Sequence, residues 1–202
     1  MKIRNFVLAF IAVLAFNVAA FANPFIKPEA VATTISVLAE AKTVIINFAN
    51  VVNDEVSVSI YDTDGNQLHT ERINEARSAS KKFNFSKVES GKYALVIIQK
   101  AVRTTQTFEV TKNEIILSEA DRMVKYLPVL KQKEDKLDVF VPMVNSTVKV
   151  AILTNEGVKV FEKATPKVVS YAQRFDLSKL SSGVYVVEVQ TDTETMYYTI
   201  KK

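Results

Sequence analysis

The chain has 202 residues and contains no Cys, no Trp and a single His. The absence of Cys excludes disulfide scaffolds, thiol catalysis and thiolate zinc sites. Hydrophobic residues make up 48% of the chain and charged residues 24%, which is the balance of a folded globular protein. The formal net charge is only +4 and is not concentrated in one half, so we expect no nucleic-acid partner.

The N-terminus has the pattern of a secretory signal peptide. Lys2 and Arg4 precede a run of 11 apolar residues, and Ala20 and Ala22 follow at the spacing that signal peptidase requires. The run is shorter than the roughly 20 apolar residues of a membrane span. We therefore expect residues 1–22 to be removed, and the exported protein to have no transmembrane span. Its expected location is the periplasm, the outer-membrane surface or the extracellular space.

The spacing of the glycines indicates an internal duplication. Gly65 and Gly157 are 92 residues apart, and so are Gly91 and Gly183. A shift of 92 residues aligns Thr43–Val110 with residues 135–202. Of the 68 aligned positions, 15 are identical without a gap. The chain is therefore predicted to contain two copies of one domain.

We expect domain 1 at residues 23–115 and domain 2 at residues 116–202, each of the size of an immunoglobulin-like domain. The joint is expected at residues 111–121, which are few and contain neither Gly nor Pro. Such a joint should hold the two domains at a restricted angle. Because small domains bury little surface, the two domains are also expected to lean on each other.

Both copies show the periodicity of β-strands. Residues 56–60 alternate apolar with small polar side chains, and an Asp-Gly pair at residues 64–65 then signals a hairpin turn. The predicted fold class is all-β, with two tandem immunoglobulin-like antiparallel β-sandwich domains after a signal peptide. The strands expected in copy one, with copy two 92 residues further on, span residues 31–38, 43–49, 55–61, 66–73, 80–85, 92–99 and 104–110.

Two tyrosines follow equivalent glycine turns. Tyr93 and Tyr185 each open a strand two residues after a glycine, which resembles the tyrosine corner of Greek-key sandwiches. In that motif the phenol hydroxyl bonds to backbone upstream of the strand. We interpret both tyrosines as structural, although a ligand-contacting tyrosine is the alternative.

Other candidate sites have an ordinary structural explanation. Asp62, Asp64 and Asn66 have the alternate spacing of calcium ligands, but turn chemistry explains them and copy two does not repeat them. His69 is replaced by Phe161 in copy two, which favours a plain strand position over a metal or catalytic role.

An aromatic platform for sugar is conceivable at Tyr197 and Tyr198, but neighbouring strand residues face opposite sides of a sheet. No pair of carboxylates stands out as a hydrolase site. We therefore predict no catalytic, cofactor-binding or metal-ligating residues and no cofactor.

The second copy resembles a known family. Val148–Ile152, Gly157 and the segment Phe175–Val189 look like the C-terminal sorting domain of type IX secretion cargo, and Lys201-Lys202 is similar to the basic ending common there. That resemblance implies an immunoglobulin-like sandwich that directs an attached protein across the outer membrane and is usually cut off. Copy one shares the resemblance more weakly, through Asn84–Tyr93.

These features predict an exported, non-enzymatic tandem β-sandwich protein. Its expected action is binding or docking at the cell envelope, with a sorting-like C-terminal domain and with another envelope protein or the secretion machinery as partner. The alternative is a small carbohydrate-binding module or a hydrolase-type enzyme, which a polar cleft would favour.

Overall fold

The computed structural model describes residues 33–38, 42–48, 56–73, 79–142 and 144–202, so the expected signal peptide lies outside the described residues. All regular structure in the described ranges is β-strand. In chain order the strands are β1 (Thr33–Leu38), β2 (Thr43–Phe48), β3 (Val56–Tyr61), β4 (Gln67–Ile73), β5 (Ala79–Asn84), β6 (Gly91–Gln99), β7 (Val102–Val110), β8 (Ile115–Tyr126), β9 (Val129–Lys133), β10 (Lys136–Val141), β11 (Ser146–Thr154), β12 (Lys159–Val168), β13 (Tyr171–Asp176), β14 (Val184–Gln190) and β15 (Thr195–Lys201).

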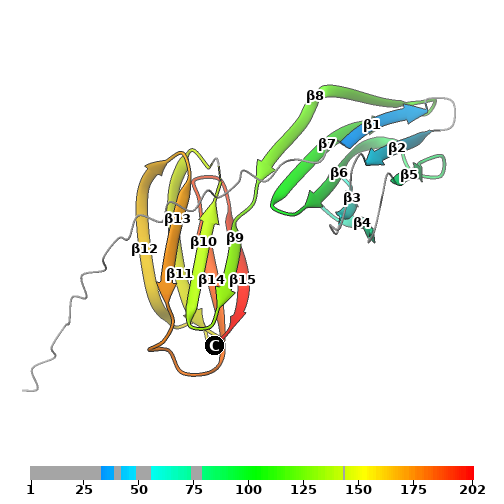
Figure 1. Cartoon of the computed structure of the whole chain (residues 1–202). Coiled ribbons are helices and arrows are strands. Elements are labelled where there is room, and N and C mark those ends of the chain that lie inside the picture. The colour runs from blue at the N-terminus through cyan, green and yellow to red at the C-terminus, as the bar shows by residue number, and fades with distance from the viewer. Residues whose placement is uncertain (1–32, 39–41, 49–55, 74–78, 143) are drawn as a thin grey trace, which may run out of the picture.

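The strands form four sheets that pair into two sandwiches (Figure 1). The first sandwich has sheets with strand orders β1-β2-β5 and β4-β3-β6-β7-β8. The second has β13-β10-β9 and β12-β11-β14-β15, so β9–β15 repeat β1–β7 in the same arrangement. All strand pairs are antiparallel. The prediction of an all-β chain of two tandem antiparallel sandwiches is confirmed.

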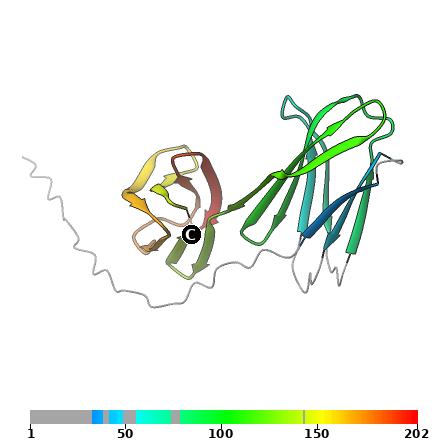
Figure 2. The same ribbon diagram turned by 90° about the horizontal axis from the view of Figure 1, so that it is seen from above.

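Each sandwich encloses its own apolar core. Alternate residues of β6 and β14 are buried, as the period of two requires, and Figure 2 shows the strands of the second sandwich nearly end-on around a common interior. The first core is built on Val44, Ile46, Val58, Leu95 and Phe108, among others. The second core is built on Leu137, Val139, Val150, Ile152 and Val187, among others. Two separate cores are the physical signature of two domains.

The predicted glycine turns are present in both copies. Gly65 has a φ of 83° and Gly157 a φ of 81°, a left-handed conformation that favours glycine. Each glycine N–H donates to the backbone carbonyl three residues earlier, at Asp62 and at Thr154. The Asp-Gly and Glu-Gly sequences therefore set the hairpins β3-β4 and β11-β12.

Both tyrosine corners are confirmed. The Tyr93 hydroxyl donates to the Glu89 carbonyl oxygen at 2.8 Å, and the Tyr185 hydroxyl donates to the Ser181 carbonyl oxygen at 2.9 Å. Burial raises the pKa of the Tyr93 phenol, with the Glu89 carboxylate adding to the effect. A third tyrosine, Tyr171, is also buried, but its hydroxyl has no hydrogen-bond partner.

The tyrosine corners predict a contrast between chemically identical substitutions. Tyr93→Phe and Tyr185→Phe should each lower the free energy of unfolding by about 0.5–1.5 kcal/mol, because the part-buried hydrogen bond that closes each corner is lost. Tyr171→Phe is the matched control, since it removes an unpaired buried hydroxyl and should leave stability unchanged or raise it. Denaturant midpoints that fall equally in all three variants would contradict the assignment.

The expected joint is a strand. We expected the joint between the domains at residues 111–121, but β8 pairs with β7 from the Val110–Ile115 pair to the Val102–Tyr126 pair. The strand β8 has no counterpart among the described residues of copy two, so a shift by 92 residues cannot reveal it. The boundary expected between residues 115 and 116 therefore falls inside β8, a strand of the five-stranded sheet of the first sandwich.

The first strand of copy two also differs from the prediction. A shift of 92 residues places it at residues 123–130, which the structure divides between β8 and β9. One reason is the β9-β10 hairpin, where only Glu134 and Asp135 separate the strands, and Glu134 has a φ of 52°. The corresponding β1-β2 connection has four residues between the strands. An alignment without gaps therefore cannot place β1 on β9 and β2 on β10 at the same time.

We propose that the joint between the two sandwiches lies at Leu127-Pro128. The Leu127 N–H still donates to the Ala101 carbonyl of the first sandwich at 2.7 Å. Pro128 follows with its fixed φ, and β9 begins at the next residue.

Truncation tests this division. Residues 23–127 should melt at a temperature at least about 5 °C above residues 23–115, because the longer fragment retains the β7-β8 pairing. Residues 128–202 alone should show β-rich circular dichroism and a cooperative melt. Equal melting temperatures for the two N-terminal fragments would place β8 outside the first domain.

Candidate functional site

The residues considered as a calcium site form a turn. The Asp62 carboxylate accepts hydrogen bonds from the backbone N–H of Asp64 at 3.0 Å and of Asn66 at 2.8 Å, and from the Asn66 amide at 2.9 Å. The bonds from Asn66 lower the Asp62 pKa. These bonds occupy both oxygens of the carboxylate in holding the β3-β4 hairpin. Within the described ranges, no group of three His, Asp or Glu side chains is placed to hold a metal ion.

His69 occupies a half-exposed position on β4. Its ring lies edge-on to Phe83, with the ring centroids 5.6 Å apart. The same edge-on contact joins Phe161 and Phe175 in copy two at 5.0 Å. His69 therefore stands at a position where the repeat packs an aromatic ring against β5.

Tyr197 and Tyr198 lie on opposite sides of β15, as the sequence predicts. Tyr197 is 64% exposed, whereas Tyr198 packs against the second core and its pKa is raised by burial. Only Tyr197 presents its ring to solvent, so the pair does not form a two-ring platform.

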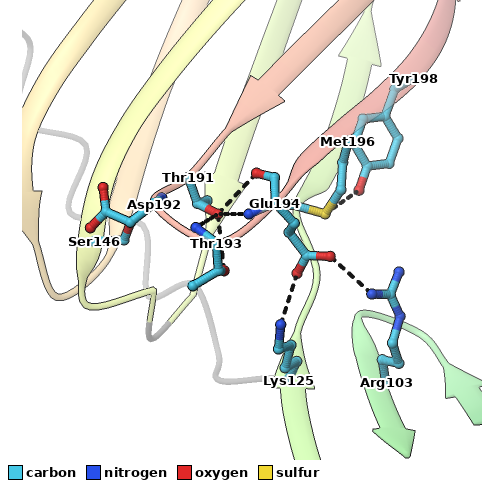
Figure 3. A network of polar contacts seen from close by, with 9 residues as sticks. All are labelled: Arg103, Lys125, Ser146, Thr191, Asp192, Thr193, Glu194, Met196 and Tyr198. Atoms are coloured by element: carbon cyan, nitrogen blue, oxygen red, sulfur yellow. Dashed lines mark hydrogen bonds and ion pairs between the residues drawn. The ribbon is translucent and has the colours of Figure 1, made fainter.

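A polar network links the two copies (Figure 3). Glu194, in the turn between β14 and β15, accepts a hydrogen bond from the Arg103 guanidinium at 3.0 Å, and its other oxygen lies 3.7 Å from the Lys125 ammonium. Arg103 and Lys125 are cross-strand partners on β7 and β8. Two neighbouring cations of the first sandwich therefore hold one carboxylate of the second.

The turn that carries Glu194 is rigid by its own hydrogen bonds. The Thr191 hydroxyl oxygen accepts from the backbone N–H of Thr193 and of Glu194, and the Thr191 N–H donates to the Glu194 carbonyl. In the same turn, the Asp192 carboxylate accepts hydrogen bonds from the backbone N–H and the hydroxyl of Thr147, and the Asp192 backbone N–H donates to the Ser146 hydroxyl oxygen. The side-chain bonds from Thr147 and Ser146 lower the pKa of the Asp192 carboxyl. The Glu194 carboxylate is thus presented from a fixed backbone.

Sequence reasoning missed this network. The 92-residue shift places Val102 opposite Glu194, so the repeat carries no signal for it. A weaker signal is present: Thr111–Glu114 and Thr191–Glu194 both read Thr-x-x-Glu and make the same turn, with the Thr N–H bonded to the Glu carbonyl. The first of these turns leads into β8, and the second leads into β15.

Glu194→Gln should loosen the two sandwiches relative to each other. The substitution removes the charge held by Arg103 and Lys125, so the distribution of distances between dyes on the two copies should widen in single-molecule energy transfer. Stability should change by less than about 1 kcal/mol, because the groups are partly exposed.

Glu162→Gln is the matched control for that experiment. Glu162 also lies between two cations, Lys149 and Lys159, but both belong to the second sandwich. This variant should leave the distance distribution unchanged, whereas about 1 M salt should widen it in the unsubstituted chain. If the distance distribution were the same for Glu194→Gln, for Glu162→Gln and for the unsubstituted chain at high salt, Glu194 would not orient the two copies.

The two copies differ most at the outer edge of the larger sheet. In copy two, Lys202 and Gly183 exchange two backbone hydrogen bonds of 2.9 and 3.0 Å. Because successive residues of a strand direct their N–H and C=O groups to alternate sides, the even-numbered residues of β15 bond to β14. The odd-numbered residues direct theirs to the open edge; these are Thr195, Tyr197, Thr199 and Lys201.

A hydrogen bond of the Lys201 carbonyl group shows that this odd-numbered residue points away from β14. The Lys201 carbonyl oxygen accepts a hydrogen bond from the Gln132 side-chain amide on β9, at 2.5 Å. No strand pairs with the outer side of β15 among the described residues. On β7, the equivalent strand of copy one, β8 occupies this side.

Gln106 helps to hold β8 in place. Its buried side-chain amide donates to the Ser118 carbonyl of β8 and to the Thr107 carbonyl of β7, both at 2.9 Å. The contact lies at a bulge, where Thr107 alone faces the residues between Leu117 and Arg122. Copy two has Tyr198 at the position of Gln106 and makes no such contact.

The chain belongs to the family of secretion system C-terminal sorting domains. The family matches residues 40–111 and, separately, residues 133–202, which together make up more than half of the chain. The resemblance to type IX sorting domains is thereby confirmed, and it extends to both copies. Residues 112–132, which contain β8 and most of β9, lie outside both matches.

Membership in this family implies export through the type IX secretion machinery, to the cell surface or the extracellular space. It also implies an interaction with that machinery. The described part of the chain contains no helix that is long and apolar enough to span a membrane.

Several solved structures match most of this chain at low sequence identity and low TM-score. The BSP domain of a biofilm associated protein is 11% identical with a TM-score of 0.29, and the match covers 84% of this chain and 28% of that one. Native alpha-2-macroglobulin from Escherichia coli, domains NIE-MG1, is 11% identical with a TM-score of 0.27 and coverages of 85% and 98%. Domains FN1-FN3 of chicken CNTN1 are 9% identical with a TM-score of 0.27 and coverages of 87% and 68%. No curated protein matches the chain in sequence.

Proposed function

We propose that this chain is an exported, non-enzymatic protein of the cell envelope, and that its second sandwich is the module that the secretion machinery recognises. The family match over residues 133–202 carries the proposal, because it covers the second sandwich from the end of β9 to the last residue of β15. Copy one is then the attached domain that the module delivers.

The difference between the copies supports this division of labour. Both belong to the sorting family, but the β8 strand covers the outer edge of copy one. No strand in the described ranges pairs with the same edge of copy two. A recognition module needs accessible surface, so copy two is the better candidate.

The residues that the two copies share maintain the sandwich. Gly157, Gly183 and Tyr185 form turns and the tyrosine corner, and their counterparts in copy one do the same. The polar residues of the candidate sites do not recur between the copies. This pattern favours binding over catalysis.

Reporter fusions in the native cell test the proposal. Residues 128–202 fused behind a periplasmic reporter should carry that reporter to the cell surface. The matched control is a fusion to residues 23–127, which have the same fold and family but a covered edge, and which should leave the reporter in the periplasm.

Deletion of Thr195–Lys202 in the whole chain should retain the protein in the periplasm, because it removes β15 with the buried Ile200. Surface delivery of the truncated chain, together with retention of the reporter fused to residues 128–202, would contradict the sorting role.

A further inference from the structure

We propose that the outer edge of β15 is a docking site for an extended, acidic segment of another protein, which adds to the sheet as β8 adds to β7. Three residues of the edge, Thr195, Tyr197 and Thr199, offer outward backbone N–H and C=O groups that face no strand in the part of the chain that the structure describes. Their counterparts on β7 lie against β8. The placement of the partner in the envelope rests on the proposed function, whereas the chemistry of the edge does not.

The β15 edge lacks the features that usually protect an exposed strand. Pro and charged side chains commonly block strand addition. The opposite edge of the same sheet, β12, has Pro166 together with Lys159, Lys163 and Lys167. Between Thr195 and Ile200, β15 has neither Pro nor a charged residue. Of the two edges of this sheet, β15 is the one that accepts a strand.

The charges around the edge favour an acidic occupant. At one end lies Lys201, for which the described residues provide no ion pair. At the other end, Arg103 and Lys125 together exceed the single charge of Glu194 by one positive charge. Positive charge at both ends of the edge, with no charged side chain of β15 itself between them, attracts a segment with spaced carboxylates.

The side of β15 that faces the core favours a docked segment with apolar residues at alternate positions. Met196 and Tyr198 are only partly buried, and the Tyr198 hydroxyl lies 3.9 Å from the Met196 sulfur. In copy one, β8 places Ile115 and Leu117 on the first core at the corresponding side. The occupant therefore has the chemistry of the first part of β8, in which residues 113–121 contain three acidic residues and no basic one.

A second copy of this chain fits the edge less well. Pairing β15 with another β15 brings together two edges that each have positive charge at both ends, and like charges across an interface oppose association. The Lys201 carbonyl is already engaged by Gln132, so a partner strand gains most of its hydrogen bonds at Tyr197 and Thr199.

A synthetic peptide is the probe. A fluorescein-labelled, capped peptide of residues 113–121 should bind residues 23–202 saturably, with a Kd of about 1 mM or tighter by fluorescence anisotropy. A peptide in which Glu114, Glu119 and Asp121 are replaced by Gln or Asn should bind at least about fivefold more weakly, and added salt should reduce this difference.

Variants of β15 locate the site. Thr199→Pro removes an outward N–H without touching the bonds to β14 and should weaken peptide binding about tenfold or more. Thr199→Val keeps the N–H and is the matched control, with binding unchanged. Lys201→Glu should weaken binding of the acidic peptide independently of any effect of Pro on folding, and thermal melts of all three variants report their stability.

The outcomes separate this inference from the proposed function. Absence of saturable binding at 1 mM peptide, or equal binding by the Pro and Val variants of Thr199, would overturn the docking site. Concentration-dependent dimerisation that Thr199→Pro abolishes would assign the edge to a second copy and would also overturn it. Surface delivery by residues 128–202 tests sorting alone, so export that persists in Thr199→Pro refutes a role of the edge in sorting and leaves the family function intact.

Discussion

Every open β-sheet ends in a strand whose outward N–H and C=O groups have no partner in that sheet, and the two copies of this chain meet that constraint differently. Copy one adds β8 and thereby covers β7. On the far side of copy two, β12 relies on Pro166 and on lysines. Between Thr195 and Ile200, β15 has no charged residue and no strand beside it among the described residues. On the function proposed above, this asymmetry separates two otherwise equivalent sandwiches into an attached domain and a recognition module.

The strand β8 has two roles. It completes the first sheet, with the Gln106 amide holding its bulge, and it contributes Lys125 to the contact with the second sandwich. The short segment Leu127-Pro128 then allows little freedom before β9 begins. The Glu194 carboxylate, fixed by its turn, lies against the cross-strand pair of Arg103 and Lys125. The orientation of the copies therefore depends on the same element that covers the first edge.

The sequence predicted those parts of the fold that the repeat encodes twice. Glycine at positive φ, alternating apolar residues and the tyrosine after Gly91 and Gly183 each have a local physical cause, so the strands β2–β7 and β10–β15 were predicted correctly. The strand β8 was missed because it occurs once and its outward positions include the exposed apolar Ile116 and Met123. The Glu194 contact was missed because it joins residues 91 positions apart, and no local pattern reports such a distance.

Native-state amide hydrogen exchange of the free chain tests the central asymmetry most directly, since it reports which backbone N–H groups are paired. Arg103 and Thr105 on β7 correspond to Thr195 and Tyr197 on β15 through the 92-residue repeat. We predict slow exchange at Arg103 and Thr105, which face β8, and fast exchange at Thr195 and Tyr197, which face none of the strands described in Figure 1. Equal protection at the equivalent positions of the two copies would contradict the account.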